Sequence, residues 1–251
     1  MQETEKTVVL RVGRFREADC WVRFLSSRRG VETAFAFGGC KSVRRFCGCL
    51  DPLSVVSFTV SDNRTGSYKT LDEGTLLHSY AGLRKNTTSV GAAVNCTKFL
   101  EALEVGPEWA KTAFDLLTGT LHLLEEGRMD AGLVPFFFRA KVAFEQGYAP
   151  DFSRCGECGK SVEDFEQHIF HIDRGMVSCP HCRQRSEEVQ GGLPVSRGTL
   201  RTLDWIRGHE PADWPKLILR KEIRQECSTF IEQFVAWHLG LSWDNGYYRK
   251  V

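Results

Sequence analysis

The sequence lacks a long apolar run, a leader-like start and an excess of charge. No stretch of about 18 apolar residues occurs in the 251-residue chain, so we expect no transmembrane helix. Residues 1–6 are polar and acidic, and no positive flank leads into an apolar stretch, so we expect no secretory signal. The formal net charge is +1, which by itself favours no polyanionic partner. These absences predict a cytoplasmic protein with no membrane partner.

Motifs of several enzyme classes are also missing. The chain contains no His-x-Glu triplet, which zinc-dependent base deaminases place ahead of their cysteine ligands. It contains no His-Glu-x-x-His motif of zinc proteases and no Walker A sequence for nucleotide binding. We therefore predict no ATP hydrolysis and no catalytic residues, and expect that the protein is not an enzyme. A zinc-dependent nuclease or deaminase remains the alternative.

Cysteine, by contrast, is plentiful, and four of the ten cysteines have the spacing of a metal site. Cys155 and Cys158 form one CxxC pair, and Cys179 and Cys182 form another, with twenty residues between the pairs. In a reducing compartment, two such pairs indicate zinc rather than disulfides. Each CxxC turn aims two sulfurs at one point, and two turns can close a tetrahedron around an ion that prefers thiolates. The sequence therefore predicts one structural zinc ion.

The other candidate ligands fit a metal site less well. Four cysteines leave no open position for a catalytic water, so the predicted zinc is not catalytic. His168 and His171 lie between the two pairs and could be alternative ligands, but an exposed hairpin strand is the favoured interpretation. Three further cysteines, at 40, 47 and 49, are interpreted as small buried hydrophobic residues.

The first eighty residues have the pattern of short β-strands. The candidate strands span residues 7–12, 20–25, 31–37, 54–60 and 68–71, and glycine-containing turns separate several of them. This length and strand number fit an OB-fold, a five-stranded Greek-key barrel. The pattern alone does not distinguish an OB-fold from an SH3-like barrel.

From about residue 75 the apolar residues follow a helical period. The candidate helices span residues 89–103, 107–126, 134–144 and 217–239, and the last of them ends before Gly240. We place the boundary between the two parts of the chain near residues 75–80.

Positive charge is concentrated near the start of the chain. Residues 11–45 contain nine Lys or Arg and three Asp or Glu, which leaves a local excess of six positive charges (nine minus three). Six aromatic residues lie in or just after this stretch, at 15, 21, 24, 35, 37 and 46. A barrel with a positive groove and aromatic platforms is typical of single-strand binding. A solvated basic face over core aromatics would give the same pattern.

Motifs along nearly the whole chain resemble the RecO family. Residues 9–19 (VLRVGRFREAD) look like its opening strand and Glu-x-Asp turn, and residues 147–151 (GYAPD), leading into the first CxxC pair, are the most specific run. The other matching runs are SSRRG at 26–30, RRF at 44–46, LDPL at 50–53, the helical residues 116–124, FFFR at 136–139 and the terminal helix 234–240 with WHLG. Residues 38–41 (GGCK) depart from the family's Gly-Ala-Arg-Arg-like loop.

This resemblance implies an α+β fold. It consists of an N-terminal OB-fold β-barrel at residues 1–78 and a mainly α-helical domain at 79–251, with an inserted four-cysteine zinc knuckle at 151–186. RecO-like proteins bind single- and double-stranded DNA and anneal strands coated with single-strand-binding protein. With RecR they load the RecA recombinase at gaps, in the bacterial cytoplasm and at the nucleoid. The implied function is recombination mediation in DNA repair by the RecF pathway. A zinc-ribbon transcriptional adapter, which would prefer particular DNA sequences, is a further alternative.

The basic N-terminal stretch and the resemblance together predict contacts for individual residues. The predicted DNA contacts are the basic residues Arg11, Arg14, Arg23, Arg28, Arg29, Lys41, Arg44 and Arg45. The acidic, apolar C-terminal tail of single-strand-binding protein is predicted to dock on the helical domain, with Arg139 and Lys141 as a basic rim. A core helix with one solvated edge would explain these two residues equally well.

Overall fold

The computed structural model describes residues 2–185 and 192–251. Two compact units make up the chain, residues 1–135 and residues 136–251. The predicted boundary after residue 78 falls at the end of the last barrel strand, whereas the first unit continues through two helices. Residue 186, the last of the predicted zinc segment, lies outside the described residues.

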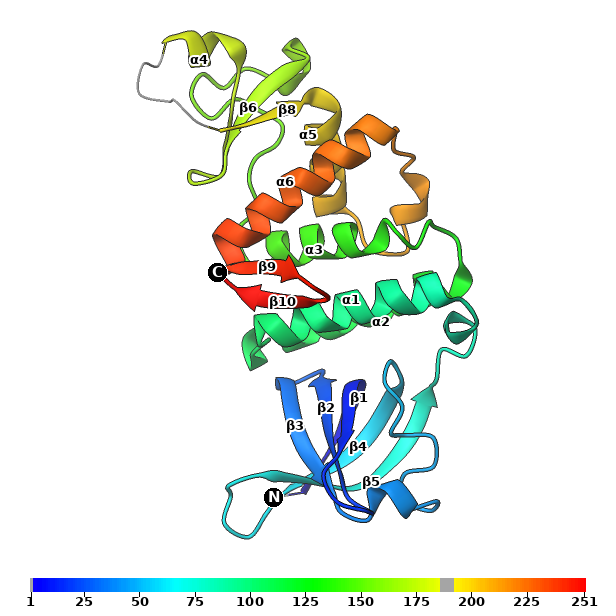
Figure 1. Cartoon of the computed structure of the whole chain (residues 1–251). Coiled ribbons are helices and arrows are strands. Elements are labelled where there is room, and N and C mark those ends of the chain that lie inside the picture. Colours follow the sequence, from blue (N-terminus) through cyan, green and yellow to red (C-terminus); the bar gives the residue numbers. More distant parts are fainter. Residues whose placement is uncertain (1, 186–191) are drawn as a thin grey trace. The chain divides into compact units, whose positions relative to one another are not determined.

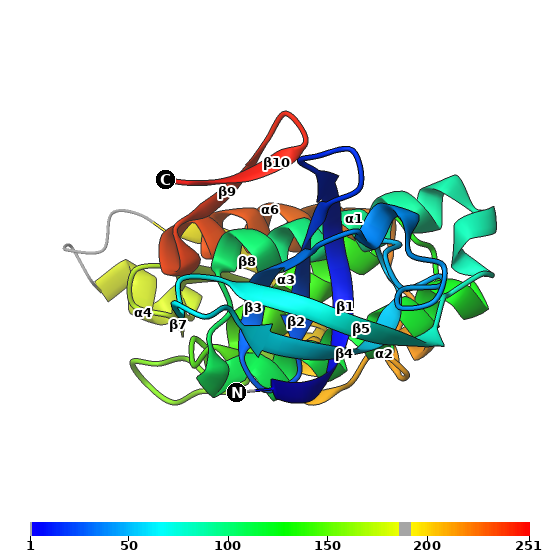
Figure 2. The same ribbon diagram turned by 90° about the horizontal axis from the view of Figure 1, so that it is seen from below.

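The first unit contains a closed five-stranded barrel (Figures 1 and 2). Its strands are β1 (Gln2–Arg14), β2 (Cys20–Ser26), β3 (Gly30–Ala36), β4 (Val55–Asp62) and β5 (Lys69–His78). The strand order around the barrel is β1-β2-β3-β5-β4, and β3 pairs with β5 in parallel while every other pair is antiparallel. This is the OB-fold predicted for the N-terminal part, and the order decides against the SH3-like alternative.

Alternating side chains fill the barrel. Val22 and Phe24 on β2 and Val56 and Phe58 on β4 are fully buried, as the period-two pattern predicts.

Two strands are much longer than the sequence pattern predicts. β1 begins at Gln2 rather than at residue 7, because its polar first half pairs with β4 in register. β5 likewise continues to His78, along the antiparallel ladder with β4.

Two helices complete the first unit, α1 (Thr87–Leu103) and α2 (Ala110–Glu126). Asn86 caps α1 by accepting hydrogen bonds from two backbone N–H groups. Both helices contact β1, and α2 also contacts β2 and β3. Gly30 makes the nearby β2–β3 turn possible, because its φ is +82° and an added Cβ would lie 2.0 Å from the carbonyl oxygen of Val105.

The second unit surrounds an aromatic core with helices and two small sheets. Its helices are α3 (Val134–Glu145, which begins two residues before the unit), α4 (Pro180–Arg185), α5 (Arg197–Gly208) and α6 (Lys221–Leu239). Its strands are β6 (Gln167–His171), β7 (Met176–Ser178), β8 (Leu193–Ser196), β9 (Leu241–Asp244) and β10 (Tyr247–Lys250). Phe144, Phe152, Phe170, Phe230 and Phe234 pack together in the core. The mixed α+β architecture confirms the predicted fold class.

The sequence patterns were wrong or silent at three places in this unit. The last long helix begins at Lys221 rather than at residue 217, and Ile218 is 92% exposed instead of packing on the helix face. α5 was missed because only three apolar residues, Leu200, Leu203 and Ile206, form its buried stripe. Of the small sheets, only the strand around His168 and His171 was predicted, because the other strands are three or four residues long. No helix within residues 2–185 and 192–251 has the length and apolarity needed to cross a membrane.

Candidate nucleic-acid interface and metal centre

Four aromatic side chains gather on the outside of the barrel. Phe15 follows β1, Phe35 lies near the end of β3, Phe37 directly follows that strand, and Tyr68 precedes β5. Ring centroids lie 5.3 Å apart for Phe15 and Phe35, and 5.4 Å apart for Phe35 and Tyr68. Phe15, Phe37 and Tyr68 are 40%, 39% and 41% exposed. These four residues are called the aromatic cluster below.

The pleat of β3 explains why two of these rings face outward. Ala34 and Ala36 point into the barrel and are fully buried, so Phe35 must point to the opposite face. The cluster joins the β1–β2 loop to the β4–β5 loop across β3. In OB-folds, these loops and the outer face of β2 and β3 are the surface that binds oligonucleotides.

An indole extends this outer face along β2. The ring of Trp21 lies over Gly13 on β1, where an added Cβ would be 2.2 Å from the ring. The guanidinium of Arg11 stands 5.2 Å from the centre of the same indole. Trp21 pairs directly with Phe35 in the β2–β3 ladder, so the outer face carries aromatic groups on two neighbouring strands.

Some predicted DNA contacts lie beside the aromatic cluster. Arg14 and Lys41 line a cavity of about 460 Å³ at this end of the barrel, and the ammonium of Lys41 also lies 2.6 Å from a carboxylate oxygen of Glu17. Arg45 is committed to the fold, because its guanidinium donates hydrogen bonds to the carbonyl oxygens of Phe37 and Asp72. Arg44 is exposed, and its side chain has no hydrogen bond or ion pair among the described residues.

Other predicted contacts already pair with acids. Arg11 and Arg23 lie 3.6 Å and 3.3 Å from one oxygen of Glu101 on α1. Arg29 lies within ion-pair distance of three carboxylates: Glu3, Glu5 and Glu32. These ion pairs were not visible in the sequence, because they join residues that lie up to ninety positions apart.

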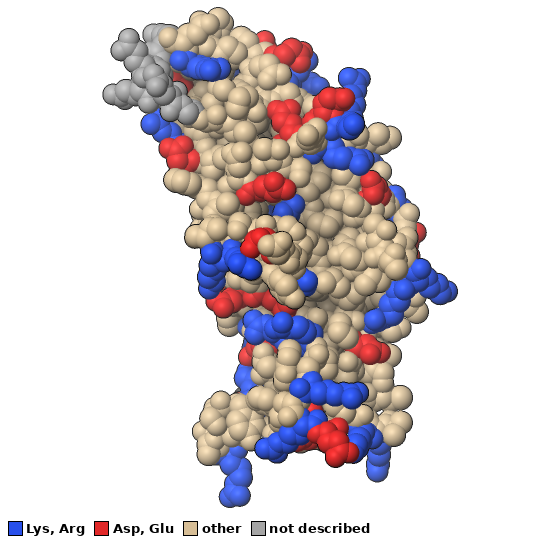
Figure 3. All heavy atoms as spheres, viewed as in Figure 1, with Lys and Arg blue, Asp and Glu red and all other residues tan. Residues whose placement is uncertain are grey.

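The eight predicted residues do not form one patch. Arg28 and Arg29 lie in the β2–β3 turn, whereas Arg14 lies at the opposite end of β2, about 20 Å away along seven strand residues. Figure 3 shows Lys and Arg side chains on the visible face of the barrel with Asp and Glu among them. The aromatic residues at 15, 35 and 37 belong to the stretch predicted to bind a single strand, whereas Tyr68 lies outside it. The parallel pairing of β3 with β5, which no local pattern reports, brings Tyr68 to the cluster.

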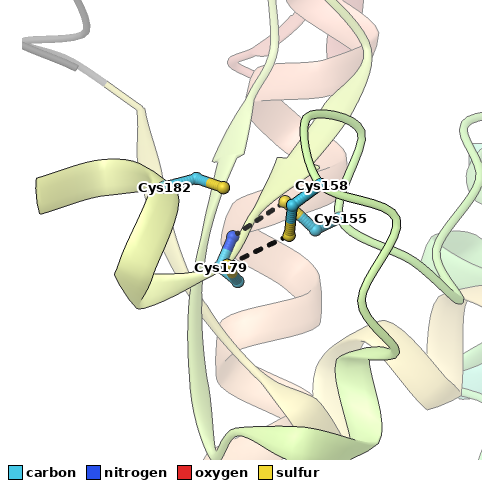
Figure 4. Close-up of side chains that lie close together, drawn as sticks. All are labelled: Cys155, Cys158, Cys179 and Cys182. Atoms are coloured by element: carbon cyan, nitrogen blue, oxygen red, sulfur yellow. Dashed lines mark hydrogen bonds between the residues drawn. The ribbon is translucent and has the colours of Figure 1, made fainter. Parts of the chain in front are cut away.

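The four predicted zinc ligands come together in the second unit (Figure 4). Cys155 and Cys158 lie in the loop before β6, Cys179 follows β7, and Cys182 lies on α4. All four sulfur atoms lie within 4.8 Å of one another, and those of Cys158 and Cys179 are 3.7 Å apart. Four sulfurs bound about 2.3 Å from one zinc ion would be about 3.8 Å apart, so the geometry fits a tetrahedral ion.

Backbone hydrogen bonds position the first pair of sulfurs. The N–H of Gly156 donates to the carbonyl of Val177 over 2.8 Å, which ties the first CxxC turn to β7. Burial disfavours the Cys155 thiolate, but hydrogen bonds from backbone N–H groups, those of Cys158 and Cys179 first, lower the pKa of this thiol to about 7. A thiolate is the form that binds a metal. This part of the structure can therefore hold a metal ion.

The histidines between the pairs lie on a strand, β6, as predicted, but the predicted exposure is wrong. His168 and His171 are buried, with exposed fractions of 3% and 5%. Burial lowers the pKa of both imidazoles. The reason is that β6 is the central strand of its sheet, flanked by β7 and β8. Neither histidine belongs to the cysteine group.

The three remaining N-terminal cysteines differ in burial. Cys49 is 1% exposed and packs in the barrel core, and Cys40 is half-buried against the same core. Cys47 is exposed, so the interpretation as a buried hydrophobic residue is wrong for that position.

The predicted rim residues Arg139 and Lys141 lie on α3. They are two positions apart, so their side chains leave nearly opposite faces of the helix. Lys141 is 4% exposed, and its ammonium lies 3.0 Å from Glu145 and 3.1 Å from Glu210 while donating to the carbonyl of Arg207. Arg139 is half-buried. The structure therefore does not place the two cations on one rim.

Comparison with known proteins gives matches along nearly the whole chain. The family model described as Recombination protein O N terminal matches residues 1–80, and Recombination protein O C terminal matches residues 84–245. A curated protein named DNA repair protein RecO from Maridesulfovibrio salexigens is 46% identical over 251 residues, with full coverage of both chains. Proteins of the same name from Nitratidesulfovibrio vulgaris and Lawsonia intracellularis are 44% and 34% identical, also with full coverage.

The ion pairs of Arg29 generate a stability prediction. Arg29→Ala leaves the Glu5 side chain, which is 0% exposed, without its cation. We expect a loss of about 3 kcal/mol in the free energy of unfolding, measured by urea denaturation. Arg28→Ala is the matched control. Arg28 is the adjacent residue and its side chain is exposed, so its loss should change the free energy of unfolding by less than about 0.5 kcal/mol. Equal unfolding midpoints for the two variants would show that the ion pairs contribute nothing.

Proposed function

The chain belongs to the RecO family of DNA repair proteins, and from this premise we propose that it is a recombination mediator. It binds single- and double-stranded DNA and anneals complementary strands. With RecR it helps to load RecA onto DNA coated by single-strand-binding protein, in the cytoplasm and at the nucleoid, where chromosomal DNA lies. The observation that carries the proposal is the exposed aromatic cluster on the oligonucleotide-binding surface of an OB-fold.

In this proposal a single strand crosses the outer face of β2 and β3. Bases stack on Phe37 and Tyr68, and on Trp21 further along the face, because aromatic rings accept any base. Arg14, Lys41 and Arg44 neutralise phosphates. Lys41 pairs with Glu17, whose side chain is 88% exposed, and such a surface ion pair is weak enough for a phosphate to replace the carboxylate. Arg29 and Arg45 are left out of the interface, because ion pairs and backbone carbonyls already hold their guanidinium groups.

Annealing then needs no covalent chemistry. Cations on the protein let two polyanionic strands approach, and base pairing drives the reaction forward. A strand held by stacking and phosphate contacts keeps its hydrogen-bonding edges free for a partner strand. The protein would thus act without a catalytic residue, and the four-thiolate group, which leaves a metal no open position, would have no part in catalysis.

The proposed interface predicts a selective loss of DNA binding. Phe37→Ala combined with Tyr68→Ala should weaken single-strand binding by about 1–3 kcal/mol for each lost stacking contact, and should slow annealing. Trp237→Ala is the control, since Trp237 is 63% exposed but lies on α6 in the second unit. Fluorescence anisotropy with a labelled oligonucleotide measures binding, and strand-pairing kinetics measure annealing.

A salt series separates stacking from charge. Arg14→Ala with Arg44→Ala should reduce the slope of log affinity against log salt by about 1.4, at about 0.7 for each lost phosphate contact. The aromatic variant should leave this slope unchanged while lowering affinity at every salt concentration. Binding by both variants at the level of the Trp237→Ala control would refute the proposed interface.

We also propose that the cysteine group binds one structural zinc ion. The donor set and the 3.7 Å sulfur separation support it. Cys155, Cys158, Cys179 and Cys182 would hold the ion, and the ion would fix the loop before β6 to α4. Since metal binding and local folding are one process in such small segments, the ion stabilises this part of the second unit.

Cys158→Ser should therefore lose bound zinc and expose the amides between residues 155 and 182 to hydrogen exchange. Cys158 is itself exposed, so the substitution removes a ligand with little loss of packing. Cys47→Ser is the control, because Cys47 is also exposed but lies in the barrel unit. Elemental analysis gives the metal content. Equal zinc content in Cys158→Ser and Cys47→Ser would contradict the proposed ligand set.

For the tail of single-strand-binding protein, we propose a hollow beside α3. Phe144, Trp205, Arg201 and Arg207 line a cavity of about 700 Å³ in the second unit. Glu145 and Asp204 also line it, and they already pair with Lys141 and Arg207. Apolar rings with nearby guanidinium groups suit an acidic, apolar peptide. Lys141 lies beneath this hollow, where it contacts the carbonyl of Arg207. Its role there would be to hold the lining in place. Arg139, the other basic contact expected from the resemblance, leaves the nearly opposite face of α3 and does not line this hollow.

Arg207→Glu should then weaken binding of a labelled tail peptide at least about tenfold, because it reverses a charge facing the peptide's acidic groups. Arg249→Glu is the matched control: like Arg207, which pairs with Asp204, it is an exposed arginine paired with an aspartate. Arg139→Ala tests the other predicted contact in the same anisotropy assay. Unchanged peptide affinity in Arg207→Glu would rule out the hollow.

A further inference from the structure

Two histidines and a glutamate converge at the junction of β5 and α2 in the first unit. The group consists of His78, His122 and Glu125, and their potential ligand atoms all lie within 4.8 Å of one another. Nε2 of His78 is already 2.8 Å from a carboxylate oxygen of Glu125. The two imidazole ring centres are 5.1 Å apart. No local sequence pattern predicts this group, because His78 lies 44 positions before His122.

The local structure explains how the three side chains meet. His78 is the last residue of β5, and His122 and Glu125 lie three positions apart on α2, so they share one face of that helix. The ring of Tyr80 packs against both imidazoles. This fully buried ring lies 4.3 Å from the ring of His78 and 5.0 Å from that of His122. The backbone at Tyr80 has a φ of +49°, an uncommon value for a bulky residue, and this turns the chain directly after β5.

The carboxylate is held in the orientation and charge state of a ligand. The N–H of Gly82 donates a hydrogen bond of 2.9 Å to one oxygen of Glu125, which leaves the other oxygen facing His78. Partial burial disfavours the charged form, but the hydrogen bonds from His78 and Gly82 outweigh it and lower the pKa of Glu125. Such a second contact to a ligating carboxylate is typical of metal sites.

We propose that His78, His122 and Glu125 form a second metal site, for a divalent first-row transition ion of the zinc class. Two imidazoles and one carboxylate are a donor set that such ions prefer, and three protein ligands leave open positions for water. Ligands about 2.0–2.2 Å from one ion are about 3.0–3.5 Å apart, so small rotations of the side chains would complete the site. The His78 side chain is 43% exposed, which gives the ion a path from solvent.

A simple hydrogen bond between His78 and Glu125 accounts for only part of this arrangement. His122 stands on the same face with neither ring nitrogen in a hydrogen bond to any described residue, and its imidazole is exposed. A metal ion uses all three groups. It would join the last residue of β5 to α2, and so would fix the barrel to the helix within the first unit.

The test uses the full-length protein with its cysteine group loaded with zinc. Cobalt(II) is then added as the probe, and calorimetry and visible absorption are recorded. We expect one further ion per chain, with the weak visible bands of nitrogen and oxygen ligands and without the intense sulfur-to-metal bands of a thiolate site. Zinc should displace it. These spectra separate the new site from the cysteine group, and they do not depend on DNA binding.

Variants decide whether the three residues are the ligands. His122→Ala and Glu125→Gln should each weaken cobalt binding at least about tenfold, as expected for losing one of three protein ligands. Glu126→Gln is the matched control, because Glu126 is the next residue on α2 but is not part of the group. The metal-free melting temperatures of the variants report whether each one folds. No further cobalt ion in the wild type, or equal affinity in His122→Ala and the control, would overturn the proposal.

Discussion

Closure of the five-stranded barrel is the constraint on which the proposed DNA interface depends. A closed barrel has no free edge, so every strand has an inside and an outside, and its residues alternate between them except at β-bulges. On β3 the inside positions are taken by Ala34 and Ala36, which suit a narrow interior. Phe35 is forced to the outside, and the chain leaves the strand with Phe37 on the surface. The hydrophobic residues that single-strand binding would need are thus exposed because the barrel is closed and full.

Electrostatics divides the basic residues of the barrel into two kinds. Arg29 is surrounded by carboxylates, one of them with a completely buried side chain, and its charge balances the interior of the fold. Arg44 has no such partner among the described residues, so its charge is available to a polyanion. A count of charges in residues 11–45 treats the two alike. The distinction matters because removing a structural arginine would destabilise the barrel and so imitate a loss of DNA binding.

The two candidate metal sites, the four-cysteine group and the group of His78, His122 and Glu125, differ in how the fold brings their ligands together. In the cysteine group, each CxxC turn places two sulfurs close together by local geometry alone, and the sheet formed by β6 and β7 only has to bring two turns together. In the histidine group, the last residue of β5 must meet two residues of α2, and only the fold of the first unit brings them together. The first is therefore an integral part of a small folding segment, whereas the second depends on a barrel that is already formed.

The sequence by itself determined the features that follow from local periodicity and spacing. These are the five barrel strands, the first three helices and the four-cysteine group, because strand alternation, helical periodicity and CxxC turns are properties of short segments. Tertiary structure alone decided which distant residues meet: Tyr68 with Phe35, Arg29 with Glu5, and His78 with Glu125. These contacts depend on strand register and on how helices dock against the barrel. Both are set by burial summed over the whole unit, and no short stretch of sequence carries that information.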